Sequence, residues 1–185
     1  IVVFIVLYTV VNIYYRKPAP PHRPYEEMVN RTTTARLLAG GWRRLPVDLR
    51  RPAEKPAAGE AAITRGAAGI GPGLGDCFVE KPPLLASIDR VAAPREVAGG
   101  EACTVYFTAS VPDQQLQLGD VVLYQHGNEI VLIPTSEHLP GTRLLSRWAD
   151  ANYGVSFPTS ALPPGRYQVR LIARGAAAQW TLTVR

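Results

Sequence analysis

Residues 103–110 read CTVYFTAS, and this short stretch decides the fold class of the chain. Its odd-numbered residues are apolar, whereas its even-numbered residues are Thr104, Tyr106, Thr108 and Ser110. A period of two is that of a β-strand with one buried face. The stretch therefore predicts a strand that lies against a core on one side.

Further strands surround this one, separated by turn residues. Counting outward gives about seven short strands between residue 84 and residue 185, with residues 126–128 (HGN) as a hairpin loop. The strands are predicted at residues 84–91, 103–110, 120–125, 129–133, 155–157, 166–173 and 179–184. This number and spacing predict a mainly-β chain that ends in an antiparallel β-sandwich.

Two segments resemble immunoglobulin-like domains. Residues 96–105 (EVAGGEACTV) resemble the turn into the second strand of many bacterial immunoglobulin-like modules. Residues 162–169 (LPPGRYQV) are similar to the LxPGxYxV entry into the sixth strand. The resemblance implies an immunoglobulin-like sandwich over residues 84–185, with Tyr167 as a corner tyrosine whose hydroxyl bonds back to the main chain. It implies little about function, because this fold supports many unrelated roles.

The two cysteines leave the redox compartment open. Cys77 and Cys103 could form one disulfide in an oxidising compartment or remain buried thiols. The strand of Tyr167 contains no cysteine, so the inter-sheet disulfide of antibody domains is not available.

Residues 1–15 (IVVFIVLYTVVNIYY) carry no charge and predict a single N-terminal transmembrane helix. Fifteen helical residues fall short of the roughly 30 Å hydrocarbon core. We expect preceding residues to supply the remainder, since the sequence opens on Ile and not on Met. Tyr14 and Tyr15 followed by Arg16 and Lys17 are typical of a membrane interface. One alternative is a buried strand, but fifteen residues are too many for an ordinary strand. The other is the core of a signal peptide, but no small-residue cleavage site follows it.

The charge is concentrated after this segment. Residues 16–60 carry ten Lys/Arg against five Asp/Glu, which equals the whole formal net charge of +5. Beside a membrane helix, such a stretch predicts contact with anionic lipid headgroups at a bacterial inner membrane. The positive-inside rule slightly favours a cytoplasmic sandwich, although sandwich domains on single-pass anchors commonly lie on the other side. Few aromatic residues interleave with the basic ones, so we expect no nucleic-acid partner.

Residues 16–83 predict a basic linker rich in Pro, Gly and Ala, with one short amphipathic helix at residues 25–39. One face of that helix either packs on the sandwich or contacts a membrane or a partner subunit. Its members are Tyr25, Met28, Val29, Thr32 and Ala35. The candidate partner contacts of the whole chain are Tyr25, Met28, Trp42 and Trp148. For Trp148 the alternative is packing on the core.

No constellation of residues indicates catalysis, a metal site, a cofactor or a small-molecule substrate. His22, His126 and His138 lack metal-ligand spacing. The contiguous residues 136–138 (SEH) do not make the geometry of a catalytic triad. The alternating glycines of residues 69–75 lack the strand and helix that flank a phosphate-binding loop.

The leading hypothesis is therefore a non-catalytic accessory subunit of a larger bacterial membrane complex, with respiratory and photosynthetic complexes as the first hosts to test. In this hypothesis the anchor helix, linker and sandwich stabilise assembly with other membrane-protein subunits. The alternative is a free-standing, membrane-tethered binding module or assembly factor, which exposed aromatics on the sandwich would favour. A cofactor carrier or enzyme that uses His126 or His138 is the third hypothesis.

Overall fold

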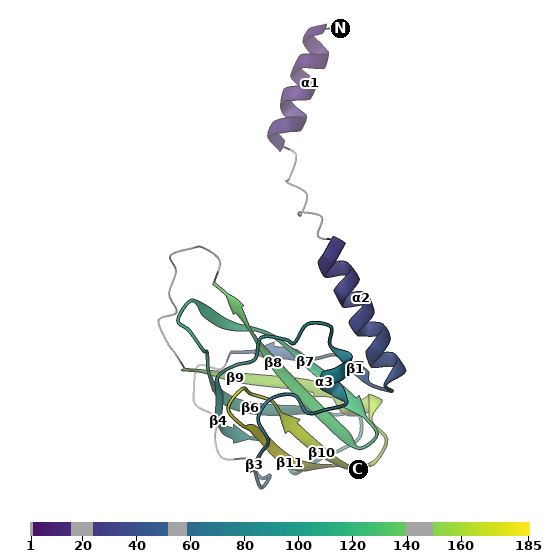
Figure 1. Ribbon diagram of the computed structural model, residues 1–185, viewed down its shortest axis with the longest axis vertical. Coiled ribbons are helices and arrows are strands. Elements are labelled where there is room, and N and C mark those ends of the chain that lie inside the picture. The colour runs from purple at the N-terminus through teal and green to yellow at the C-terminus, as the bar shows by residue number, and fades with distance from the viewer. Residues whose placement is uncertain (1, 16–23, 52–58, 140–149) are drawn as a thin grey trace.

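The computed structural model describes residues 2–15, 24–51, 59–139 and 150–185, and their strands form two packed sheets (Figure 1). The elements in chain order are α1 (Val2–Tyr15), α2 (Pro24–Ala39), β1 (Arg43–Leu45), β2 (Asp48–Arg50), β3 (Thr64–Gly66), α3 (Leu74–Cys77), β4 (Ser87–Ala92), β5 (Glu96–Val97), β6 (Ala102–Ser110), β7 (Leu116–His126), β8 (Glu129–His138), β9 (Asp150–Pro158), the 3₁₀ helix η1 (Thr159–Ala161), β10 (Gly165–Leu171) and β11 (Ala177–Val184).

The larger sheet, sheet A, has seven strands in the order β1-β7-β8-β10-β11-β3, with β5 paired to β11. The smaller sheet, sheet B, has four strands in the order β2-β9-β6-β4. The chain changes sheet repeatedly between β4 and β10, which ties the two sheets together. The predicted mainly-β class with two packed sheets is confirmed.

The core lies between the sheets. The odd-numbered side chains of β6, which include Val105 and Phe107, are at most 2% exposed, as their alternation predicts. The ring of Phe107 packs on Tyr153 of β9, with centroids 5.7 Å apart. Each fully buried side chain of this size contributes about 1.5–3 kcal/mol through the hydrophobic effect. This cluster therefore supplies most of the apolar burial that holds the sandwich.

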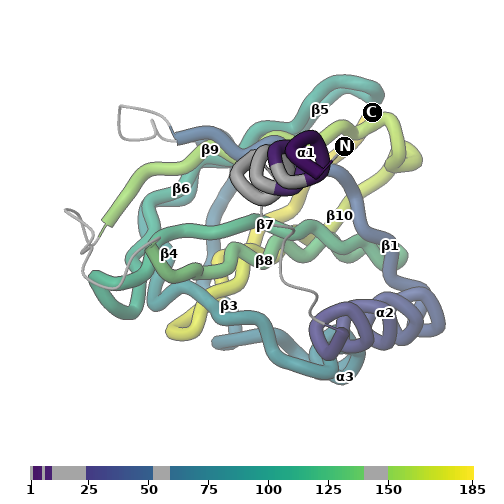
Figure 2. Tube along the Cα trace, turned by 90° about the horizontal axis from the view of Figure 1, so that it is seen from above, coloured from purple at the N-terminus to yellow at the C-terminus, as the bar shows by residue number. Residues whose placement is uncertain are grey.

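Sheet A is covered on its other face as well. Ile130, Val131, Leu132 and Ile133 are consecutive in β8 and at most 1% exposed, so both faces of the strand are buried. The outer face packs on Trp42 and on the helices α2 and α3, which lie side by side in Figure 2. A continuous apolar run is the pattern of a strand covered on both faces.

The prediction of a transmembrane helix over residues 1–15 is wrong. Helix α1 has fourteen residues, which span about 21 Å at the α-helical rise, against a hydrocarbon core of roughly 30 Å. Among the described parts of the chain, no helix combines the length and the apolar character needed to cross a membrane. The prediction gave the apolar composition more weight than the length.

The helix predicted at residues 25–39 is confirmed as α2, which begins one residue earlier at Pro24. Within the predicted linker, the structure also forms the short strands β1 and β2. Each of the short strands β1, β2 and β3 forms an edge of its sheet, pairing with β7, β9 and β11 respectively. Strands of three residues are too short to show a period, so the linker prediction did not include β3.

The sandwich is not wholly antiparallel as predicted, because β8 and β10 pair in parallel. In the immunoglobulin order, the strand that follows the second strand lies beside the strand of the corner tyrosine. Here β8, the second strand of the β7–β8 hairpin, occupies that place. Both hairpin strands are rich in buried residues, so their pattern could not indicate which one would be the neighbour of β10.

Two local predictions are confirmed. The Tyr167 side chain is 3% exposed, and its hydroxyl donates a hydrogen bond of 2.6 Å to the Pro163 carbonyl. In the β7–β8 hairpin, His126 pairs with Glu129 and Gly127 has a φ of 53°. A positive φ favours glycine, which explains the tight turn.

Candidate interaction surfaces

Five of the predicted site residues cannot be placed. Tyr14 and Tyr15 belong to the last turn of α1, but their side chains lie outside the described part of the structure, as do Arg16, Lys17 and Trp148. Their roles at a membrane interface or in partner contact therefore stay predictions.

The other three predicted contacts divide into two groups. Tyr25 and Met28 of α2 are 60% and 59% exposed. Trp42 is 8% exposed and packs on the His126 ring, with centroids 5.0 Å apart. The structure thus leaves Tyr25 and Met28 exposed, whereas Trp42 is buried in the outer cluster with Leu37.

Helix α2 docks through a stripe that shares only Val29 with the predicted face. Leu37 is buried, and Val29 and Thr33 are half-buried, whereas Thr32 and Ala35 are exposed. Residues separated by four positions lie on one side of a helix, so Val29, Thr33 and Leu37 form the docking stripe.

Polar contacts hold α2 to the segment after α3. The Thr33 hydroxyl oxygen accepts a hydrogen bond of 3.4 Å from the Val79 N–H. The Tyr25 hydroxyl donates one of 2.9 Å to the Glu80 carboxylate, which raises the pKa of Tyr25 because the bond favours the protonated phenol. These contacts lie on the side of α2 that faces residues 79–80.

A groove of about 630 Å³ runs between α2, the segment at residues 78–83 and strand β7. Its walls include Leu37, Phe78 and Tyr124, and the last two rings meet edge to face with centroids 5.9 Å apart. At its rim Arg44 and Asp120 form an exposed ion pair of 3.6 Å. The groove is thus apolar within and charged at its edge.

The outer face of sheet B is a second exposed surface, and it is polar. Hydroxyl and amide side chains pair across β6 and β9: Thr104 with Ser156 at 2.8 Å and Thr108 with Asn152 at 2.8 Å. Between these two pairs lies Tyr106, which is 40% exposed.

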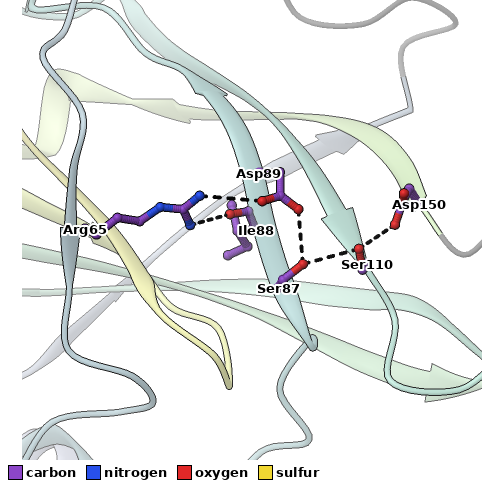
Figure 3. Close-up of polar contacts among 6 residues, drawn as sticks. All are labelled: Arg65, Ser87, Ile88, Asp89, Ser110 and Asp150. Atoms are coloured by element: carbon purple, nitrogen blue, oxygen red, sulfur yellow. Dashed lines mark hydrogen bonds and ion pairs between the residues drawn. The ribbon is translucent and has the colours of Figure 1, made fainter.

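A chain of polar contacts continues across the far end of this face (Figure 3). Ser110 donates a hydrogen bond to Asp150, and Ser87 lies 3.3 Å from Ser110 and 3.1 Å from Asp89. Arg65 reaches over from β3 and donates to the Ile88 carbonyl at 2.8 Å. The Arg65 guanidinium therefore supplies a hydrogen-bond donor to an outward-facing backbone carbonyl of β4, an edge strand of sheet B.

The cysteines and histidines belong to the packed interior or to strand ends. Cys77 lies in the outer cluster and Cys103 in the inter-sheet core, and neither forms a disulfide. Burial raises the pKa of Cys103 to about 12. His126 packs on Trp42, and His138 ends β8. Within the described ranges, no three His, Cys, Asp or Glu side chains are placed to hold a metal ion.

Sequence reasoning missed two exposed residues. Leu38 is 68% exposed beside the buried Leu37, and helical spacing alone could not separate these neighbours. Tyr106 had a signal, because it lies on the polar face of residues 103–110. The alternation already identified Tyr106 as outward-facing, and an aromatic ring among hydroxyl groups is a candidate contact.

Comparison of the chain with protein-family models, with curated proteins and with solved structures finds no match. The class of protein is therefore defined by its own architecture. It is a mainly-β protein with two packed sheets, an outer helical cover on sheet A, and exposed apolar side chains on its N-terminal helices.

Proposed function

We propose that this protein is a non-catalytic accessory subunit of a larger protein assembly, which it joins through α1 and α2. The supporting observation is where apolar side chains are exposed. Among the described residues, eleven large hydrophobic side chains are exposed, and nine of them lie on these two helices. The nine are Val2, Val3, Phe4, Ile5, Leu7, Tyr8, Tyr25, Met28 and Leu38.

Helix α1 gives the stronger support. Those of its apolar side chains that the structure describes are 56–75% exposed, whereas a helix that is apolar on all sides is normally buried. Exposed apolar surface of this extent is typical of an interaction site. A partner subunit that offers apolar side chains would cover it.

Helix α2 adds a mixed surface. Tyr25, Met28 and Leu38 are exposed beside the ion-paired Arg31 and Glu27. An apolar centre with a polar rim is the usual anatomy of a protein interface. The sandwich has its own core, so in this proposal it is the folded body that the helices attach to the assembly.

The relationship to immunoglobulin-like modules is also part of the proposal. The tyrosine corner supports it, and the parallel β8–β10 pair is a departure from that order. A respiratory or photosynthetic host and a bacterial inner-membrane location stay predictions.

The test is to isolate the tagged full chain from its native cells in mild detergent and to measure the stoichiometry of co-purifying proteins by mass spectrometry. We expect recovery at a fixed ratio with other subunits. The double substitution Phe4→Ser and Leu7→Ser removes apolar contact and should reduce this recovery at least about tenfold.

Val79→Ser is the matched control, because Val79 is an exposed hydrophobic residue outside the two helices. This variant should co-purify with the same subunits as the native chain. Recovery of the native chain alone, or equal recovery by all variants, would show that the helices do not join it to an assembly.

A further inference from the structure

The outer face of sheet B has a composition unlike that of the helices. We propose that this face binds a neutral carbohydrate chain, with Tyr106 as the stacking platform. The inference goes beyond the proposed subunit role, since it concerns a separate surface formed by β2, β9, β6 and β4.

The ring of Tyr106 lies over the backbone of the neighbouring strand. Tyr106 pairs with Gly154, and a Cβ added at Gly154 would be 2.9 Å from Cε1 of the tyrosine. Glycine therefore leaves the space that the ring occupies, and 40% of the Tyr106 surface remains exposed. A sugar ring presents apolar C–H groups on one side, and an exposed aromatic ring offers the apolar surface that they require.

Hydrogen-bonding groups flank the ring on both sides. Thr104 and Ser156 share one hydrogen bond, which uses one of their two hydroxyl donors. Thr108 donates to the Asn152 carbonyl oxygen, which fixes the amide group of Asn152. Within the described residues no partner is found for the Asn152 nitrogen, so its two N–H groups remain available for sugar hydroxyls.

The charges of the face are largely paired. Asp48 pairs with Arg50 at 2.9 Å, and Arg65 lies 3.5 Å from Asp89. The Asp150 carboxylate accepts the hydrogen bond from Ser110, as Figure 3 shows. A face of this kind lacks the excess of Lys and Arg that nucleic acids require. It matches a neutral ligand that is rich in hydroxyl groups.

The length of this face favours a polymeric ligand. The outward side chains of β6 run from Thr104 to Ser110, about 20 Å at the rise of a β-strand. A protein partner is the competing occupant, but a protein interface has an apolar core of several residues. Among the described residues of this face, Tyr106 alone is both large and hydrophobic and exposed.

The test measures binding of cellohexaose, laminarihexaose, mannohexaose and chitohexaose to the full chain by isothermal titration calorimetry in mild detergent. We expect binding of at least one of them. Tyr106→Ala should weaken that binding at least about tenfold, because the stacking surface is lost. Tyr106→Phe should bind almost as the native chain does, because it keeps the ring.

Two further variants separate recognition from folding. Asn152→Ala removes an amide but no packed ring, so it should weaken binding with the fold intact by circular dichroism. Tyr25→Ala lies on α2 and should bind as the native chain does. Failure of every hexasaccharide to bind the native chain, or unchanged binding by both Tyr106→Ala and Asn152→Ala, overturns the proposal. Loss of a co-purifying subunit on Tyr106→Ala, without sugar binding, would assign the face to a protein partner instead.

Discussion

At the residue scale, Thr159 shows how one buried hydroxyl organises a turn. Its side chain is fully buried, accepts a hydrogen bond of 3.1 Å from the Gly100 N–H and donates one of 2.7 Å to the Glu101 carbonyl. The turn between β5 and β6 is thereby attached to η1. No sequence pattern indicated this role, because the partners are almost sixty positions apart.

Thr159→Val keeps the shape of the side chain but removes the hydroxyl. The Gly100 N–H then loses its protein partner, and a typical intramolecular hydrogen bond contributes about 0.5–1.5 kcal/mol net. We expect the free energy of unfolding in urea to fall by that amount. Thr159→Ser keeps the hydroxyl and should lose less. A valine variant as stable as the native chain would mean that water replaces the hydroxyl.

At the element scale, α2 tests how the outer cover is held. Leu37 is 7% exposed and lies in the cluster with Trp42, whereas Leu38 is 68% exposed. The two residues are identical in type and adjacent in the same helix. Their difference in burial makes them a matched pair for measuring how strongly the helix is docked.

Leu37→Ala should loosen α2 by about 2–5 kcal/mol, the usual cost of truncating a buried leucine. Hydrogen exchange measured by mass spectrometry should therefore accelerate in peptides of α2 and remain unchanged in β6 and β9. Leu38→Ala should leave the exchange of α2 nearly unaltered. Equal acceleration in both variants would show that the leucine contact does not hold the helix.

At the scale of the whole molecule, one buried cysteine thiol and two buried tyrosine hydroxyls predict that the fold is less stable at alkaline pH. Burial raises the pKa of Cys103 from 9.0 to about 12 and also raises the pKa of Tyr124 and of Tyr153 above 10.0. The folded state thus keeps protons that the unfolded state releases. The contribution of these groups to the free energy of unfolding should be fully present below about pH 9 and should decline as the pH rises toward 12.

Urea unfolding midpoints measured from pH 8 to pH 11 check this prediction. Cys103→Ala removes the thiol, so its midpoint should decline less steeply above pH 9 than that of the native chain, although a cavity lowers its overall stability. A midpoint that stays constant or rises with pH in the native chain would contradict the prediction.

The sequence by itself determined the elements whose pattern is local. The alternation in residues 103–110 gave β6, proline and glycine bounded α2, and the motif around Tyr167 gave the tyrosine corner. These features depend on the period of side chains and on the conformational limits of Pro and Gly, which short stretches of chain already contain. The outward position of Tyr106 belongs to the same class.

Only the tertiary structure decided which elements became neighbours. The parallel β8–β10 pair, the edge strand β3 and the packing of Trp42 on His126 all join residues far apart in the chain. Their formation depends on total buried area and on which sheet faces remain to be covered, quantities that no local period contains. For the same reason the sequence left open whether the predicted face of α2 packs on the sandwich, and only the packed structure showed that Tyr106 lies over Gly154.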